Sequence, residues 1–213
     1  MKSFYNRKWI IYDFNKYVDI SRWHSYYHQI KAVCECGWKS VLLVWIWDWI
    51  VVEILRKLGF NVTTFDFDEG LNPDIVWDVK KIDEYIYDKY DIVVCSQVLE
   101  HIPFELFEAT IKRICKITKN LLLSLPNKNI RVKFWFYAPI LGDIIKKIHF
   151  RMFWKNQRDV NKEWFWEHYW EVDALPKWKK YKIEKILKKY FNIEDYFVSF
   201  NNTYHMFRRL SKK

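Results

Sequence analysis

Apolar residues along the chain follow two alternating periods. Residues 41–44 are a continuous apolar run typical of a buried strand, whereas Ile50–Leu58 has apolar residues at helical spacing and stops at Gly59. Val62–Phe65 is a second strand-like run, rich in β-branched residues, and it leads directly to Asp66. This order predicts a strand, turn, helix and strand followed by an acid, which is the outline of a nucleotide-binding βαβ unit.

The same alternation continues along the rest of the chain. Short apolar runs predict strands and amphipathic runs predict helices, with strands at 75–76, 91–96 and 120–124 and helices at 80–87 and 105–116. A helix over 181–190 precedes two strands, 193–199 and 204–210, with the turn residues Asn201-Asn202 between them. The sequence therefore predicts an α/β fold: a Rossmann-like wound sheet, mostly parallel, with a C-terminal antiparallel hairpin and helices on both faces.

The length of 213 residues suits a single domain with its own core. We divide it into four parts: an N-terminal segment 1–39 with a helix over 21–34, a βα core 40–127, a basic and aromatic insertion 128–178, and a closing helix and hairpin 179–213.

The turn after the first predicted strand does not match its context. In a nucleotide-binding unit this turn carries glycines, because the backbone approaches the ligand closely, but here Trp45, Trp47 and Trp49 hold those positions. The chain has 13 tryptophans and only 4 glycines, against a usual glycine share of about 7%. One hypothesis is that UGA codons read as glycine in the organism were translated as tryptophan. The alternative is a real turn filled with indoles, and UGG codons at these positions would establish it.

Charge is distributed unevenly. The formal net charge is +10, yet residues 1–126 carry 16 basic and 17 acidic residues while residues 127–213 carry 20 and 9. Such an asymmetry indicates an acidic partner, for example nucleic acid, an anionic membrane surface or a phosphorylated substrate. Solvated lysine-rich faces explain it equally well.

Other classes of protein are disfavoured by what the sequence lacks. No apolar run is long enough to cross a membrane, and the first residues do not have the layout of a signal peptide, so we expect a cytoplasmic protein. The four cysteines form no Cys-x-x-Cys pair, which argues against zinc or a disulfide framework. His24 and His28 lie one helical turn apart without a third ligand nearby, so we expect no metal site.

Residues 40–127 resemble the class I S-adenosylmethionine-dependent methyltransferases, in particular the type 11 and type 23 groups. The resemblance rests on the order and spacing of short motifs: Val41-Leu-Leu-Val44 before the turn, Asp66, Asp78-Val79, Asp91-Ile-Val-Val-Cys-Ser-Gln-Val-Leu-Glu-His-Ile102 and Leu121-Leu-Leu-Ser-Leu-Pro-Asn127. Leu43 stands where the family often has an acid, and the three tryptophans replace its glycines.

The resemblance implies S-adenosylmethionine as the cofactor and assigns roles to individual residues. The turn with Trp45, Trp47 and Trp49 would hold the methionine part, and Asp66, beside Phe67, would hold the ribose hydroxyls. The remaining cofactor-binding residues are Asp78 and Val79 for the adenine and Ser96 and Gln97 beside the methyl group.

Two histidines are candidate catalytic residues. His101 follows the fourth predicted strand, and His168 lies between Glu167 and Glu171 at the end of the insertion. Structural roles are the alternative for both, in a helix start for His101 and in closing a lid for His168. Residues 133–154 interleave basic and aromatic side chains, which suits a lid on the core, contact with a membrane surface or a nucleic-acid surface.

We therefore expect a methyltransferase that moves a methyl group to an acceptor by in-line displacement. The acceptor would be a small molecule, a glycan or a lipid-linked compound, with nucleic acid also open. The alternative is a non-catalytic protein of the same fold that does not bind the cofactor and binds an acidic or membrane partner through its basic C-terminal part. A nicotinamide-dependent oxidoreductase is less favoured, because Leu99-Glu-His-Ile102 and the closing hairpin do not indicate one.

Overall fold

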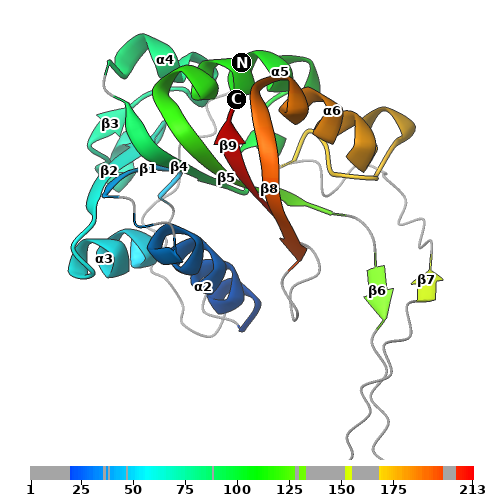
Figure 1. Ribbon diagram of the computed structural model, residues 1–213, viewed down its shortest axis with the longest axis horizontal. Coiled ribbons are helices and arrows are strands. Elements are labelled where there is room, and N and C mark those ends of the chain that lie inside the picture. The colour runs from blue at the N-terminus through cyan, green and yellow to red at the C-terminus, as the bar shows by residue number, and fades with distance from the viewer. Residues whose placement is uncertain are drawn as a thin grey trace, which may run out of the picture.

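The computed structural model describes residues 20–35, 37, 39–46, 48–87, 89–127, 130–132, 152–154, 168–198 and 205–213. A seven-stranded mixed sheet forms the centre of the described chain, in the order β3-β2-β1-β4-β5-β9-β8 (Figure 1). Its strands are β1 (Ser40–Val44), β2 (Asn61–Asp66), β3 (Ile75–Val76), β4 (Tyr90–Ser96), β5 (Thr118–Pro126), β8 (Phe191–Val198) and β9 (His205–Lys212). A separate antiparallel pair consists of β6 (Ile130–Val132) and β7 (Met152–Trp154).

Strands β1 to β5 pair in parallel, and β9 pairs antiparallel with both β5 and β8. The chain moves outward from β1 through β2 to β3 and then returns to place β4 on the other side of β1. The strand order therefore reverses between β1 and β4, and ligands in open α/β sheets bind at the carboxyl ends of the strands at such a point.

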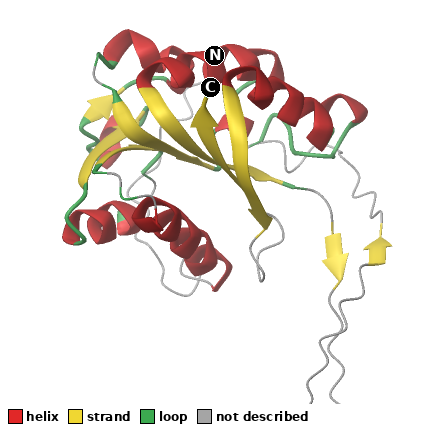
Figure 2. Ribbon diagram, viewed as in Figure 1, coloured by secondary structure: helices red, strands yellow, loops and turns green. Residues whose placement is uncertain are grey.

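Helices cover both faces of this sheet. One face carries α2 (Ile20–Glu35) and α3 (Ile50–Lys57), and the other carries α4 (Ile82–Tyr85), α5 (Phe104–Ile117) and α6 (Lys180–Tyr190) (Figures 1 and 2). Within the described residues, four short 3-10 helices lie in the connections: η1 (Glu69–Leu71), η2 (Val79–Lys81), η3 (Leu99–His101) and η5 (Pro176–Trp178).

The period-two alternation of strand side chains explains why the core has two halves. In β1, Leu42 and Val44 join the hydrophobic cluster under α5 and α6, whereas Val41 and Leu43 join the cluster under α2 and α3. All four side chains are buried, which is why this strand reads as one continuous apolar run. Each such burial stabilises the fold by roughly 1.5–3 kcal/mol.

The predicted fold class is confirmed, and the differences are in the boundaries of elements. The helix predicted over 80–87 is the 3-10 turn η2 followed by the single turn of α4, which ends at Tyr85 because Ile86 adopts an extended conformation. Strand β5 is longer than predicted because β9 pairs with it as far as Pro126. The turn residues Asn201-Asn202 and most of the insertion lie outside the described residues.

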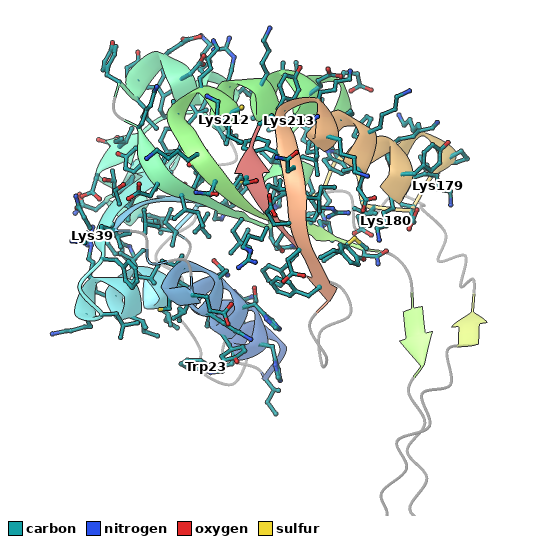
Figure 3. The ribbon with its side chains drawn as sticks, in the orientation of Figure 1. Trp23, Lys39, Lys179, Lys180, Lys212 and Lys213 are labelled. Atoms are coloured by element: carbon teal, nitrogen blue, oxygen red, sulfur yellow. The ribbon has the colours of Figure 1, made fainter. Side chains whose placement is uncertain are left out.

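Four of the basic residues described in the C-terminal part lie in two separate pairs. Lys179 and Lys180 lie at the start of α6, whereas Lys212 and Lys213 lie beside its other end, where the Lys213 N–H donates to the Tyr190 carbonyl (Figure 3). An 11-residue helix is about 16 Å long, so a single small anion would not contact both pairs. Within the described residues, no helix has the length and apolar character needed to span a membrane.

Candidate functional site

The loop between β1 and α3 has the backbone conformation that glycine favours. Trp45 has a φ of 69° and Trp49 a φ of 64°, both in the left-handed region, which costs a residue with a side chain roughly 1–2 kcal/mol. Hydrogen bonds fix this shape: the Trp45 N–H donates to the Phe65 carbonyl at 2.7 Å and the Trp49 N–H to the Ile46 carbonyl at 3.1 Å. Trp47 lies outside the described residues.

The two described indoles of this loop lie toward opposite faces of the sheet. The Trp49 Nε1–H donates to the Leu71 carbonyl at 3.1 Å, and its ring packs on the α2 and α3 side. The Trp45 ring stacks on His101 with 4.6 Å between centroids and contacts Phe67 edge-on at 5.3 Å. Only the ring of Trp45 therefore lies among the other candidate site residues.

Asp66, at the end of β2, holds the same loop closed. Its side chain is buried, and its two carboxylate oxygens accept hydrogen bonds from the N–H groups of Ile46 and Asp68, each at 3.0 Å. Burial raises the pKa of Asp66, although these two hydrogen bonds favour the ionised form and act in the opposite direction. The carboxylate that the sequence assigns to a ribose thus also fixes the backbone at 46 and 68.

Asp78 occupies the corresponding place at the next strand. It follows β3, and its carboxylate accepts from the Lys80 N–H at 2.9 Å and pairs with Lys80 Nζ at 2.9 Å. Val79 packs against the core beside Trp77, whose ring lies 3.7 Å from that of Tyr85. Since β2 and β3 are parallel neighbours, Asp66 and Asp78 mark the carboxyl ends of adjacent strands.

The loop after β4 also begins with a left-handed residue, but the side chain at that position is polar. Gln97 has a φ of 58°, and its N–H donates to the carbonyl of Ser124, the residue that pairs with Ser96. In the orientation that satisfies both amide atoms, the Gln97 side-chain oxygen accepts from Ser124 Oγ at 2.7 Å and the Leu125 N–H at 3.3 Å, and its nitrogen donates to Glu100 Oε1 at 3.2 Å.

Glu100 is the most deeply buried acid of this loop. Its side chain has no exposed surface, and its Oε2 has no hydrogen-bond partner among the described residues. Burial raises the pKa of Glu100 well above the usual value of a glutamate. Two main-chain carbonyls of this segment hold the end of the insertion in place: the Tyr169 N–H donates to the Glu100 carbonyl at 2.7 Å, and the Trp170 Nε1–H donates to the Ile102 carbonyl at 3.0 Å.

These main-chain contacts bring the two candidate histidines together. The rings of His101 and His168 meet edge-to-face with 4.9 Å between centroids. His168 Nδ1 lies 3.2 Å from Glu171 Oε1, and its Nε2 lies 4.0 Å from Glu100 Oε1. Since His101 also stacks on Trp45, the two histidines lie next to the loop after β1.

Most of the residues that the sequence singles out thus lie at the carboxyl ends of β1 to β4. Contacts join Phe67, Trp45, His101 and His168 in one row, whereas Trp49 and Asp78 make their contacts elsewhere. Sequence reasoning overlooked Glu100 as a site residue. The one signal for it is an acid enclosed by the apolar residues Leu99 and Ile102, a position where a carboxylate is rarely tolerated without a purpose.

Comparison with known proteins gives a family for this chain. Residues 48–188, more than half of the chain, match the sequence model of a methyltransferase domain. No curated protein matches the chain.

Solved structures resemble it in fold. Magnesium protoporphyrin IX methyltransferase from Synechocystis PCC 6803 with bound SAM has a TM-score of 0.60 and 15% identity, covering 97% of this chain and 86% of that one. N-methyltransferase NodS from Bradyrhizobium japonicum WM9, in complex with S-adenosyl-L-homocysteine, has a TM-score of 0.61 and 9% identity over 91% and 88%. The 1,6-didemethyltoxoflavin-N1-methyltransferase of Burkholderia thailandensis has a TM-score of 0.54 and 11% identity over 94% and 84%.

Proposed function

The chain belongs to the methyltransferase domain family that its residues 48–188 match, and from that membership we propose that it is an S-adenosylmethionine-dependent methyltransferase. The reaction is an in-line displacement in which an acceptor atom takes the methyl group and S-adenosylhomocysteine leaves. The three similar structures above contain S-adenosylmethionine or S-adenosylhomocysteine, which supports this choice of cofactor.

The backbone between β1 and α3 is the observation that supports the proposal best. Left-handed conformations at Trp45 and Trp49 form the kind of turn that brings bare main chain against a ligand, and the turn lies where the strand order reverses. A helix-to-strand packing role alone would not require two left-handed residues within five positions.

Of the described residues around this turn, one has a side chain that does not suit the cofactor. The turn at 45–49 would hold the methionine part, Asp66 with Phe67 the ribose, Asp78 with Val79 the adenine, and Ser96 with Gln97 the region of the methyl group. The ring of Trp45, which stacks on His101 and contacts Phe67 edge-on, would occupy space that the ligand needs. A glycine at position 45 would suit both the φ angle and the ligand.

When bound, S-adenosylmethionine supplies an activated methyl group, and the protein's part is to align the acceptor with it. Such alignment contributes up to roughly 7–11 kcal/mol to lowering a reaction barrier. We propose that His101 and His168 contact the acceptor, because they lie next to Trp45 and beside the buried carboxyl group of Glu100. The insertion 128–178, whose end carries His168, would cover the acceptor and select it.

We propose a small molecule, a glycan or a lipid-linked compound as the acceptor. Residues 133–151, through which a membrane surface or RNA would be contacted, lie outside the described residues.

The second candidate function is a non-catalytic protein that keeps the fold without the cofactor. The position of the Trp45 ring favours it for the chain as printed. Calorimetric titration with S-adenosylhomocysteine separates the two, using this chain and a variant with glycine at positions 45, 47 and 49. Binding by the glycine variant supports the methyltransferase, and binding by neither protein supports the non-catalytic alternative. The codons at these positions show which of the two proteins the organism makes.

A further inference from the structure

We propose that Glu100, His101 and His168 form a binding site for a divalent first-row transition-metal cation. Among the described residues, these three side chains make up the one group of metal-ligating type whose ligand atoms lie close together, all within 4.8 Å of one another. They come from two segments far apart in the chain, η3 and the end of the insertion. The histidine spacing in the sequence gives no sign of the group.

The geometry needs little change to enclose a cation. Metal–nitrogen and metal–oxygen distances of about 2.0–2.2 Å place the ligand atoms of a tetrahedral site about 3.4 Å apart. His168 Nε2 and Glu100 Oε1 are already 4.0 Å apart, so this pair has to close by less than about 1 Å. The Tyr169 N–H and the Trp170 indole N–H donate to the carbonyls of Glu100 and Ile102, and these two hydrogen bonds hold the two segments of the site together.

Glu171 lies on the side of the His168 ring that faces away from Glu100 and can hold the ring in place. Its Oε1 lies 3.2 Å from His168 Nδ1, so a proton on Nδ1 is held toward Glu171 and the lone pair of Nε2 is directed toward the Glu100 side. Metal-binding histidines generally donate their second ring N–H to a carboxylate in this way, which fixes the tautomer and the orientation of the ring. A histidine that merely filled space would not need this arrangement.

The buried acid supplies an independent reason to expect a cation. Glu100 has no exposed surface, and its Oε2 has no hydrogen-bond partner among the described residues. Gln97 donates to Oε1, but burying a carboxylate whose other oxygen has no partner is expensive, and buried charges in proteins are normally paired or bound to a metal ion. Here the acid is directed toward two imidazole rings, and a divalent cation between them would compensate its charge.

The mixture of ligand atoms indicates the class of metal. Two imidazole nitrogens and one carboxylate oxygen suit Zn²⁺, Fe²⁺ or Co²⁺, whereas Mg²⁺ and Ca²⁺ prefer sites made of oxygen atoms. Three protein ligands leave coordination positions open, as in catalytic rather than structural sites.

The site also suggests a class of acceptor, an extension that rests on the proposed function. A cation held beside Trp45 would take an oxygen atom of the acceptor as a further ligand and lower the pKa of a bound hydroxyl group. His101 and His168 would then act on the acceptor through the metal. Acceptors with a hydroxyl or phenol oxygen are therefore expected.

Metal binding is tested on the full chain without cofactor or acceptor, so the result does not depend on methyl transfer. The protein is stripped with a chelator and titrated with Co²⁺, which is followed by visible absorption, and then with Zn²⁺ by calorimetry. Glu100→Gln and His168→Ala remove ligands, and His24→Ala removes an imidazole from α2 as the matched control. Circular dichroism confirms that each variant is folded.

We expect one Co²⁺ per chain, displaced by Zn²⁺ but not by an equal concentration of Mg²⁺. Glu100→Gln and His168→Ala should each weaken binding by at least about tenfold, and His24→Ala should leave it unchanged. Absence of Co²⁺ and Zn²⁺ binding by the unaltered chain would overturn the proposal whatever the variants do. Undiminished binding by both ligand variants, or equal competition by Mg²⁺, would also overturn it.

Discussion

The loops after β1 and β4 leave neighbouring parallel strands, and each contains a left-handed residue, Trp45 in the first and Gln97 in the second. In the first loop the side chains at the left-handed positions are indoles, and the shape is held by the main chain and by Asp66. In the second loop the side chain of Gln97 itself makes the connections, to Ser124 and Glu100.

This difference shows what each loop requires of its sequence. The first loop needs a backbone conformation, and any side chain beyond glycine at its left-handed positions adds strain and volume. The second loop needs particular polar groups, because its acid is buried and its amide has donor and acceptor groups to satisfy. Substitutions should therefore affect ligand binding in the first loop and stability in the second.

The largest expected effect is on binding at the first loop. Trp45→Gly should raise the affinity for S-adenosylhomocysteine at least about 100-fold, or roughly 2.7 kcal/mol, because it removes the ring between Phe67 and His101. Trp49→Gly is the matched control, since its ring is turned toward Leu71, and it should change the affinity by much less. Calorimetry measures both, and an equal gain in the two variants would contradict the distinction between these indoles.

The next effect is on stability at the second loop. Gln97→Ala should lower the free energy of unfolding by about 2 kcal/mol, because it removes the donor to Glu100 and the acceptor for Ser124 and Leu125. Gln29→Ala is the control: it removes a buried amide whose one hydrogen bond among the described residues is to Ser25 Oγ at 3.3 Å, and it should cost less. Urea unfolding of the original chain and the two variants tests this. Equal losses of unfolding free energy in the two variants would show that the Gln97 side chain stabilises its loop no more than Gln29 stabilises α2.

Asp66→Asn tests how the first loop is closed. Asparagine offers one carbonyl oxygen in place of two acceptors, so either the Ile46 or the Asp68 N–H loses its partner, at a cost of about 1–2 kcal/mol. The loss of unfolding free energy caused by Asp66→Asn should depend on pH. Because burial raises the pKa of Asp66, its contribution to stability is fully present below the unfolded pKa of about 3.9 and falls as pH rises through the folded pKa.

The difference in unfolding free energy between the original chain and Asp66→Asn should therefore be largest near pH 4 and narrow as pH rises. Urea titrations from pH 4 to pH 8 measure it. A difference that widens with pH would mean that the ionised carboxylate is the favoured form in the folded protein.

The smallest effect is expected at the opposite end of the sheet. Asp91 accepts from the Ser40 N–H at 3.1 Å, Ser40 Oγ at 3.0 Å and the Lys39 N–H at 3.2 Å, and these bonds, led by the one from the Ser40 main chain, lower the pKa of Asp91. Its contribution is thus present above the unfolded pKa of about 3.9 and lost as pH falls through the folded pKa. Asp91→Asn should cost about 1 kcal/mol at pH 7 and little in acid.

Asp91→Asn should leave ligand and metal binding at the carboxyl ends unchanged, because β1 and β4 separate Asp91 from the two loops. Unfolding curves at pH 3 and pH 7 and one Co²⁺ titration check this. A loss of metal binding would mean that the two ends of the sheet are coupled.

Much of the fold was predictable because each helix or strand has a recognisable pattern in its own stretch of sequence. The apolar run at 41–44, the helical spacing at 50–58 and the acid at 66 predict the unit that the structure contains as β1, α3 and β2. The helix predicted over 80–87 was too long, since a few favourable residues do not show whether tertiary contacts will extend a helix or leave it as a single turn.

The sequence by itself determined the wound α/β sheet, the closing hairpin and the position of the candidate ligand turn, because periodicity and turn chemistry are properties of neighbouring residues. Only the tertiary structure decided that Trp45 lies on His101 while Trp49 turns away, and that Glu100, His101 and His168 meet. Residues 101 and 168 are brought together by hydrogen bonds between distant segments, from the Tyr169 N–H and the Trp170 indole, and no local pattern encodes such a contact.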